Sequence, residues 1–245
     1  MEKPVRFTFS NGRTALAVHV QHTKELPVAL HELGLRNDHP VLVLVGGASK
    51  MDNTGLNRLR SLFVEGLVPV VTALDAVVID GGTDAGVMQL MGHARATATF
   101  PLIGVAPYGK VNIPGQHQQG TPLEPHHTHF VLVPGTRWGD ESQWLSHVAS
   151  VLSDRTASLT LLVNGGEISW EDVAQSVNAA RPVIILEGTG RTADALARAM
   201  RGEASDERAI SLVASSLLRV VDVTGDFDEL SNLIREMLSL PPQGP

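Results

Sequence analysis

Short apolar runs alternate with helical patterns along most of the chain. Six runs of four or five mostly apolar residues are typical of strands buried on both faces: 41–45, 76–79, 102–106, 130–133, 159–163 and 183–186. Helical spacing appears at 54–72, 84–97, 140–152, 169–180 and 192–201. This alternation predicts an α/β fold, with a Rossmann-like, mostly parallel sheet and helices on both of its faces.

The two ends of the chain depart from this pattern. Residues 5–20 alternate around Ser10-Asn11-Gly12-Arg13 and predict an N-terminal β-hairpin, which a short helix at 26–35 follows. Beyond a polar break lie an apolar stretch at 210–223 and an amphipathic helix at 227–238. We expect one domain over residues 1–202, and a C-terminal helical appendage over 203–245 that packs on it.

Composition excludes several classes of protein. Of 245 residues, 43% are hydrophobic and 18% charged, which is typical of a globular chain. The formal charge of −7 and the absence of a lysine and arginine cluster argue against polymeric nucleic acid as a partner. There is no cysteine, and we expect neither a signal peptide nor membrane insertion, which fits a cytoplasmic protein.

Four glycine-bearing turns join a predicted strand to a predicted helix. They are Val45-Gly46-Gly47-Ala48, Asp80-Gly81-Gly82-Thr83 with Gly86 close behind, Asn164-Gly165-Gly166-Glu167, and Glu187-Gly188-Thr189-Gly190-Arg191. A glycine at such a turn is explained by the tight bend alone. Four at one sheet edge also favour a crevice lined by backbone amides, which suits a phosphate or pyrophosphate.

Two arginines are candidates for binding the anion. Arg191 opens a predicted helix, where a cation opposes the helix dipole, so we expect it to meet a phosphate rather than only solvent. Arg137 and Trp138 are adjacent and suit a phosphate and a stacked base, although Trp138 is equally compatible with covering an edge of the core.

Acidic residues follow the third glycine turn. Glu171 and Asp172 lie in the first turns of a predicted helix, for which Ser169 is the expected N-cap. Favourable helix-dipole chemistry explains them without a function. The functional alternative is a general acid or a carboxylate that binds ribose.

Histidines crowd residues 117–129. They are His117, His126, His127 and His129, and His127 and His129 would share one face of a strand. Because we find no cysteines or clustered carboxylates to complete a site, we expect hydrogen bonding and loop packing here, with no metal and no required cofactor.

Several motifs, in one order, resemble the N-terminal cytosolic region of the melastatin-type TRP channels, the LSDAT branch of the SLOG superfamily. The similar segments span roughly residues 15–200 and are Gly46-Gly47-Ala48, 58–67, Gly81-Gly82-Thr83-Asp84-Ala85-Gly86-Val87-Met88, 103–109, His127-Thr128-His129-Phe130, Gly165-Gly166 and Gly188-Thr189-Gly190-Arg191 with Asp194. The resemblance implies a free-standing, prokaryotic-type module that binds a nucleotide such as ADP-ribose. By motif, Arg191 would contact phosphate and the paired glycines would line the pocket.

The superfamily also includes the Lonely Guy phosphoribohydrolases, whose motif has a third glycine and a catalytic glutamate. Here Ile168 stands at that glycine and Asp172 at the glutamate's spacing. Three hypotheses therefore stay open. The first is a sensor for an ADP-ribose-like or other adenine-nucleotide signal. The second is a nucleotide N-glycosidase that uses Asp172 or Glu171. The third is an interaction module without a ligand, acting as a homo-oligomer or with a separate effector protein.

Overall fold

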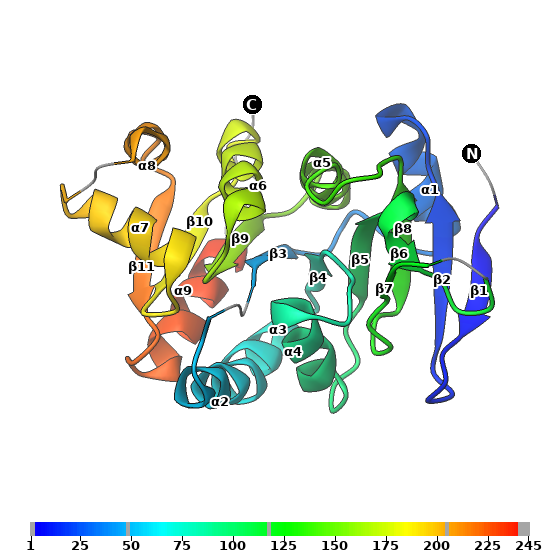
Figure 1. Ribbon diagram of the computed structural model, residues 1–245, viewed down its shortest axis with the longest axis horizontal. Coiled ribbons are helices and arrows are strands. Elements are labelled where there is room, and N and C mark those ends of the chain that lie inside the picture. The colour runs from blue at the N-terminus through cyan, green and yellow to red at the C-terminus, as the bar shows by residue number, and fades with distance from the viewer. Residues whose placement is uncertain (1–2, 48–49, 117–118, 204–205, 240–245) are drawn as a thin grey trace.

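A nine-stranded sheet forms the centre of the protein (Figure 1). The computed structural model describes residues 3–47, 50–116, 119–203 and 206–239. The strand order is β1-β2-β8-β5-β4-β3-β9-β10-β11, and every neighbouring pair is parallel except β1 and β2. The strands are β1 (Val5–Thr8), β2 (Thr14–His19), β3 (Val41–Gly46), β4 (Val77–Asp80), β5 (Leu102–Pro107), β8 (His129–Val133), β9 (Ser158–Val163), β10 (Val183–Glu187) and β11 (Leu218–Asp222). The predicted α/β class and mostly parallel sheet are confirmed.

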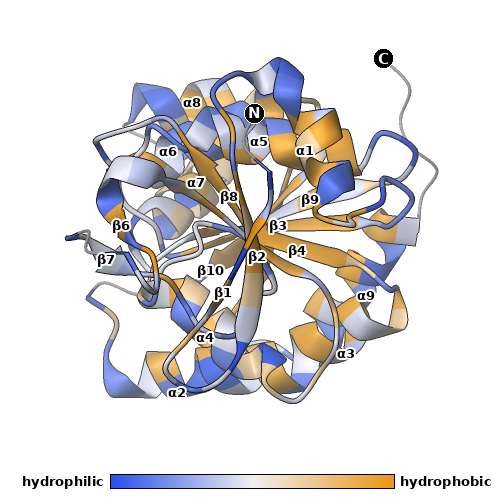
Figure 2. Cartoon of the chain, turned by 90° about the vertical axis from the view of Figure 1, so that its right-hand side faces the viewer, coloured by the Kyte–Doolittle hydropathy of each residue, from blue (hydrophilic) through white to orange (hydrophobic). Residues whose placement is uncertain are grey.

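Helices cover both faces of the sheet, and their apolar sides are turned inward (Figure 2). One face carries α1 (Leu26–Glu32), α5 (Ser142–Leu152), α6 (Glu167–Asn178), α7 (Arg191–Met200) and α8 (Glu207–Val213). The other carries α2 (Asn53–Ser61), η2 (Leu62–Leu67), α3 (Val68–Ala73), α4 (Gly86–Arg95) and α9 (Phe227–Ser239). Alternate residues of the central strands enter the two cores. In β3, for example, Val43 belongs to the core beneath α5 and α6, and Leu44 belongs to the core beneath α4.

The helix predicted over residues 54–72 continues to Ala73. Within this helical segment, η2 is a π-helical turn, and Pro69, which has no N–H to donate, is the second residue of α3. Gly66 lies where α9 crosses η2, and its carbonyl accepts a hydrogen bond from Ser231 Oγ at 3.0 Å.

The C-terminal segment contributes to the sheet itself. We expected an apolar stretch and a helix after residue 203. The structure places β11 beside β10 in parallel, from Val183 opposite Leu218 to Glu187 opposite Asp222. Helix α9 then packs against the face that carries η2 and α3.

The segment at 109–125 has only short regular elements among its described residues. It holds a short 3-10 turn, η3 (Tyr108–Lys110), and the two-residue strands β6 (Val111–Asn112) and β7 (Thr121–Pro122). Val111, Ile113 and Leu123 pack with Phe130 in a third, smaller core at this side of the sheet. Among the residues that the structure describes, no helix is long and apolar enough to cross a membrane.

The closest backbone approach at the centre of the sheet involves Gly46, at the end of β3. Its φ of +126° is one that side chains rarely adopt, and a Cβ here would lie 1.9 Å from the carbonyl oxygen of Val163 in β9. The neighbouring Gly47 has open space where a Cβ would be.

We expect Gly46→Ala to lower the free energy of unfolding by about 3–5 kcal/mol, because the added Cβ is both overpacked and in a strained conformation. The matched change Gly47→Ala should stay within about 0.5 kcal/mol of the native protein. Urea unfolding of both variants measures the difference. Equal stability of the two would contradict the close packing of β3 on β9.

Candidate functional site

A cavity of about 310 Å³ opens at the carboxyl ends of β3 and β4, between α4 on one side and α5 and α6 on the other. This is where ligands bind in open parallel sheets, because the strand order changes direction between β3 and β9. The lining residues are Leu44, Val45, Gly46, Gly81, Thr83, Ala85, Met88, Thr121, Trp138, Glu141, Leu145, Ile168, Ser169 and Asp172. The wall is therefore mostly apolar, with a few polar groups.

Two carboxyl groups face this cavity. Burial raises the pKa of Asp172 to about 7, and the carboxylates of Glu141 and Glu171 act in the same direction. Burial also raises the pKa of Glu141, although its Oε2 accepts a hydrogen bond from Gly139 N at 2.8 Å. With a pKa of about 7, the Asp172 carboxyl can donate as well as accept hydrogen bonds near neutral pH, which suits ligand hydroxyls.

The structure separates the two acidic candidates of α6. Asp172 lines the cavity, whereas Glu171 is exposed and accepts a hydrogen bond from Gln175 at 2.6 Å. Glu141 was missed by the sequence reasoning. Its only sequence signal was its position next to Gly139 and Asp140, at the start of a predicted helix.

In each of the four glycine turns, one amide is already bonded within the protein. Gly47 N donates to Val163 O at 3.1 Å and Gly82 N to Asp80 Oδ1 at 2.7 Å. Gly166 N donates to Ser169 Oγ at 3.1 Å, and Gly188 N to Asp194 Oδ1 at 2.8 Å. These four amides hold their own turns, so they are not available to a phosphate while these bonds last.

Ser169 was expected as the N-cap of its helix, and this was wrong. The helix begins two residues earlier, at Glu167, with Gly166 as the N-cap. Ser169 occupies the third helical position, and its hydroxyl accepts the Gly166 amide. In an ordinary serine cap, the side chain of the N-cap residue accepts a hydrogen bond from an amide inside the helix. Here the N-cap is Gly166, which has no side chain, and its own amide donates to Ser169 inside the helix.

Most of the other turn glycines are required by the conformation of the backbone. Gly82, Gly86, Gly165, Gly188 and Gly190 all have positive φ values, which glycine adopts most readily. Gly81 is different, because its φ is ordinary and a Cβ would meet only Met88, at 3.8 Å. Gly81 lines the cavity, so the absence of a side chain there enlarges the cavity and is not required for packing.

Arg191 lies over the start of α6. Its guanidinium nitrogens are 2.9 and 3.0 Å from where a Cβ on Gly166 would be, so a side chain at Gly166 would displace it. The residue has a φ of +52° and is exposed. Thr192 Oγ1 donates to Gly166 O at 3.1 Å, and this bond ties the first turn of α7 to the start of α6.

The side chains of Arg137 and Trp138 lie in different environments. The Arg137 side chain is 86% exposed and lies 3.8 Å from Asp140, while Trp138 lines the cavity. The cation that faces the indole ring is Lys110, whose Nζ is 5.6 Å from the ring centroid. Lys110 was not among the predicted residues, because it lies distant in sequence, in η3.

The remaining predicted residues are engaged elsewhere. Glu187 pairs with Arg201 at 2.6 Å. Thr189 is buried, and its hydroxyl accepts from Asn164 N at 2.7 Å and donates to Leu186 O at 2.6 Å. Ala48 and His117 lie outside the described residues.

Residues 39–231 match the family described as "SLOG in TRPM, prokaryote". The chain belongs to that family. The matched range includes β3 to β11, and so every strand that borders the cavity of the SLOG domain.

Relatives of the SLOG domain occur in much longer proteins. Member 2 of transient receptor potential cation channel subfamily M is 29% identical over 217 residues in Mus musculus and 28% over 217 residues in Rattus norvegicus. Each alignment covers 72% of this chain but only 14% of the channel. Member 6 from Homo sapiens is 25% identical over 192 residues, which is 64% of this chain and 10% of the channel.

A solved structure shares the fold. The X-ray structure of TM1055, a structural genomics target, aligns with a TM-score of 0.52 and 19% identity over 80% of this chain and 99% of that one. At this identity the likeness concerns the fold alone.

The carboxyl of Asp172 makes stability depend on pH. Because its folded pKa is raised to about 7, the free energy of unfolding falls as the pH rises from the ordinary aspartate range through 7. We expect Asp172→Asn to raise the free energy of unfolding by about 1–3 kcal/mol near pH 8, a gain that disappears as the pH falls below about 4. Urea unfolding across this range measures it, with Asp154→Asn as the control, because Asp154 is an exposed aspartate that does not line the cavity. A gain from Asp172→Asn that is independent of pH would rule out this titration.

Proposed function

We propose that this SLOG domain binds an adenine-nucleotide derivative of the ADP-ribose type. One observation carries the proposal: the first turns of α6 border two different environments. Ile168, Ser169 and Asp172 line the cavity, while Gly166 lies under the guanidinium of Arg191. A ligand with a hydroxyl-bearing end and a phosphate end can therefore use both.

Charge decides which end of the ligand goes where. Glu141 and Asp172 line the cavity, so a phosphate inside it would oppose any ionised carboxyl. Ribose hydroxyls suit these carboxyls, because they can donate to an ionised oxygen and accept from a protonated one. The sugar end is thus placed beside Glu141 and Asp172, with Trp138 offering an apolar face nearby.

The phosphates are placed at the start of α6. Arg191 brings the charge, and its planar guanidinium matches phosphate in two-point hydrogen bonding. The positive ends of the α6 and α7 dipoles lie close together there, since Ala193 N bonds to Asn164 O at 2.9 Å. The amide of Gly166 is taken by Ser169, so Arg191 and the two dipoles, rather than that amide, supply the attraction.

Comparison of two arginines on the same helix tests the phosphate site. Arg198 is also exposed on α7, about two turns from Arg191. We expect Arg191→Ala to weaken ADP-ribose binding by about 1.5–3 kcal/mol in isothermal titration calorimetry, the range for a hydrogen bond to a charged group. Arg198→Ala removes the same charge away from α6 and should leave affinity nearly unchanged.

Equal losses in the two variants would show a general charge effect and contradict the site. If ADP-ribose, NAD and AMP all fail to raise the melting temperature of the native protein, the interaction-module hypothesis replaces this one.

A second candidate function, N-glycosidic hydrolysis, is favoured by one observation: a carboxyl with a pKa of about 7 lies in the cavity. General acid–base catalysts work best with a pKa near the working pH. Asp172 would then act on the bond between ribose and base, while the exposed Glu171 is poorly placed for it. Ile168 projects into the space that a third glycine would leave open in the Lonely Guy pattern, and it disfavours the same substrate pose.

Chromatography separates binding from hydrolysis. We expect AMP, NAD and ADP-ribose to remain intact after incubation with the native protein. Release of free base that Asp172→Asn abolishes and Glu171→Gln does not would establish hydrolysis in place of sensing.

A further inference from the structure

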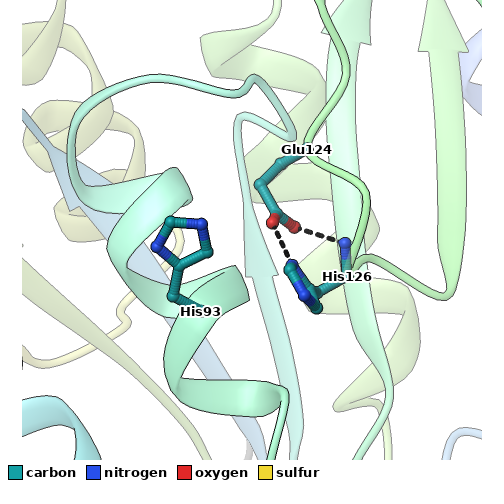
Figure 3. Close-up of side chains that lie close together, drawn as sticks. All are labelled: His93, Glu124 and His126. Atoms are coloured by element: carbon teal, nitrogen blue, oxygen red, sulfur yellow. Dashed lines mark hydrogen bonds and ion pairs between the residues drawn. The ribbon is translucent and has the colours of Figure 1, made fainter. Parts of the chain in front are cut away.

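A second cluster of polar side chains lies outside the cavity. His93 belongs to the last turn of α4, and Glu124 and His126 belong to the segment before β8. One ligand atom from each residue lies within 4.8 Å of those of the other two. Figure 3 shows the two imidazole rings and the carboxylate around a common space between α4 and this segment.

Glu124 is held in place from several sides. It is fully buried, and its Oε2 accepts hydrogen bonds from His126 N and His127 Nδ1, each at 2.8 Å. Its Oε1 lies 2.6 Å from His126 Nδ1. Gly92 makes room for the carboxylate, since a Cβ there would lie 2.0 Å from its carbon. The carboxylate is thus fixed against the backbone of α4, one residue before His93.

His126 is also positioned by its surroundings. Its carbonyl accepts from Arg95 Nη1 at 3.1 Å, and Arg95 Nε in turn donates to Phe100 O at 2.7 Å. The side chain of His126 is only 16% exposed, and its ring meets that of His93 edge-on at 5.6 Å between centroids. His93 is exposed, so it lies on the solvent side and can rotate to close the remaining distance.

We propose that His93, Glu124 and His126 form a binding site for a divalent transition-metal ion of the zinc class. Two imidazoles and one carboxylate are a ligand set that zinc, nickel and ferrous iron accept, whereas magnesium and calcium prefer oxygen ligands alone. Zinc–ligand bonds of about 2.0–2.2 Å hold two ligand atoms roughly 3.4 Å apart in a tetrahedral site. The exposed His93 reaches this separation by rotating inward. The ion replaces the proton between His126 Nδ1 and Glu124 Oε1, which are 2.6 Å apart in the metal-free protein. The ion stays open to solvent on the His93 side, leaving a position for water.

The protein also provides the outer contacts that metal ligands need. Glu124 is hydrogen-bonded by His127, whose Nε2 contacts Asp80 Oδ1 at 2.8 Å. Such outer contacts orient ligands and are worth about 10–100-fold in metal affinity. Asp80 also accepts Gly82 N, so this chain of contacts reaches the turn that forms one wall of the cavity. The proposed metal site is therefore connected to the wall of the cavity by hydrogen bonds, although its three ligands do not line the cavity.

The test compares zinc binding in variants of the untagged, metal-free protein. Competition with a chromophoric chelator should show one tight zinc equivalent in the native protein. His93→Ala should weaken that equivalent by at least about tenfold, because it removes one of three ligands. The matched control is His31→Ala, since His31 is likewise exposed in the last turn of a helix, α1.

Folding is checked by melting each variant in chelator, where we expect His93→Ala and the native protein to agree. A cobalt-loaded native protein should show visible absorption bands of a nitrogen- and oxygen-ligated ion, and His93→Ala should lose them. The proposal is overturned if the native protein binds no zinc equivalent in this competition. It is equally overturned if His93→Ala retains the native affinity, or if His31→Ala loses as much as His93→Ala.

Discussion

The close approach of β3 and β9 at their carboxyl ends governs the rest of the structure. No side chain fits at Gly46, because the backbone of Val163 already occupies that space. In the strand order of the sheet, β4, β5 and β8 lie on one side of this pair, and β10 and β11 lie on the other. The turns after the two strands therefore open at one edge, and the cavity forms where they diverge.

Charge is distributed unevenly around that edge. The cavity holds two carboxyls whose pKa values are raised by burial, while the cations lie beyond it. Lys110 stands over Trp138, and Arg191 lies over Gly166. For the nucleotide that we propose as the ligand, this separation favours one orientation, because its sugar and its phosphates have opposite electrostatic preferences. The glycine turns then act mainly as the frame of the site, since one amide in each is already bonded.

The sequence predicts the strands and most helices because buried parallel strands leave a local apolar pattern. It predicts the glycine turns for the same reason, but it does not reveal what their amides contact. Glu141, Lys110 and Glu124 were missed because their roles arise only from long-range packing. Glu124 lies near His93 because the loop before β8 packs against α4. The hydroxyl of Ser169 accepts a hydrogen bond from Gly166 N, and Ser169 is not the N-cap of its helix. Such pairings depend on the folded chain and have no signature in spacing.

The most direct test of the account is a crystal structure of the protein grown with ADP-ribose. The account predicts the terminal ribose beside Glu141 and Asp172, and the pyrophosphate at the start of α6 within hydrogen-bonding distance of Arg191. A ligand bound with its phosphates beside the two carboxyls would contradict it. So would a ligand at the opposite end of the sheet, in the hollow lined by Ser150, Arg219 and Met237.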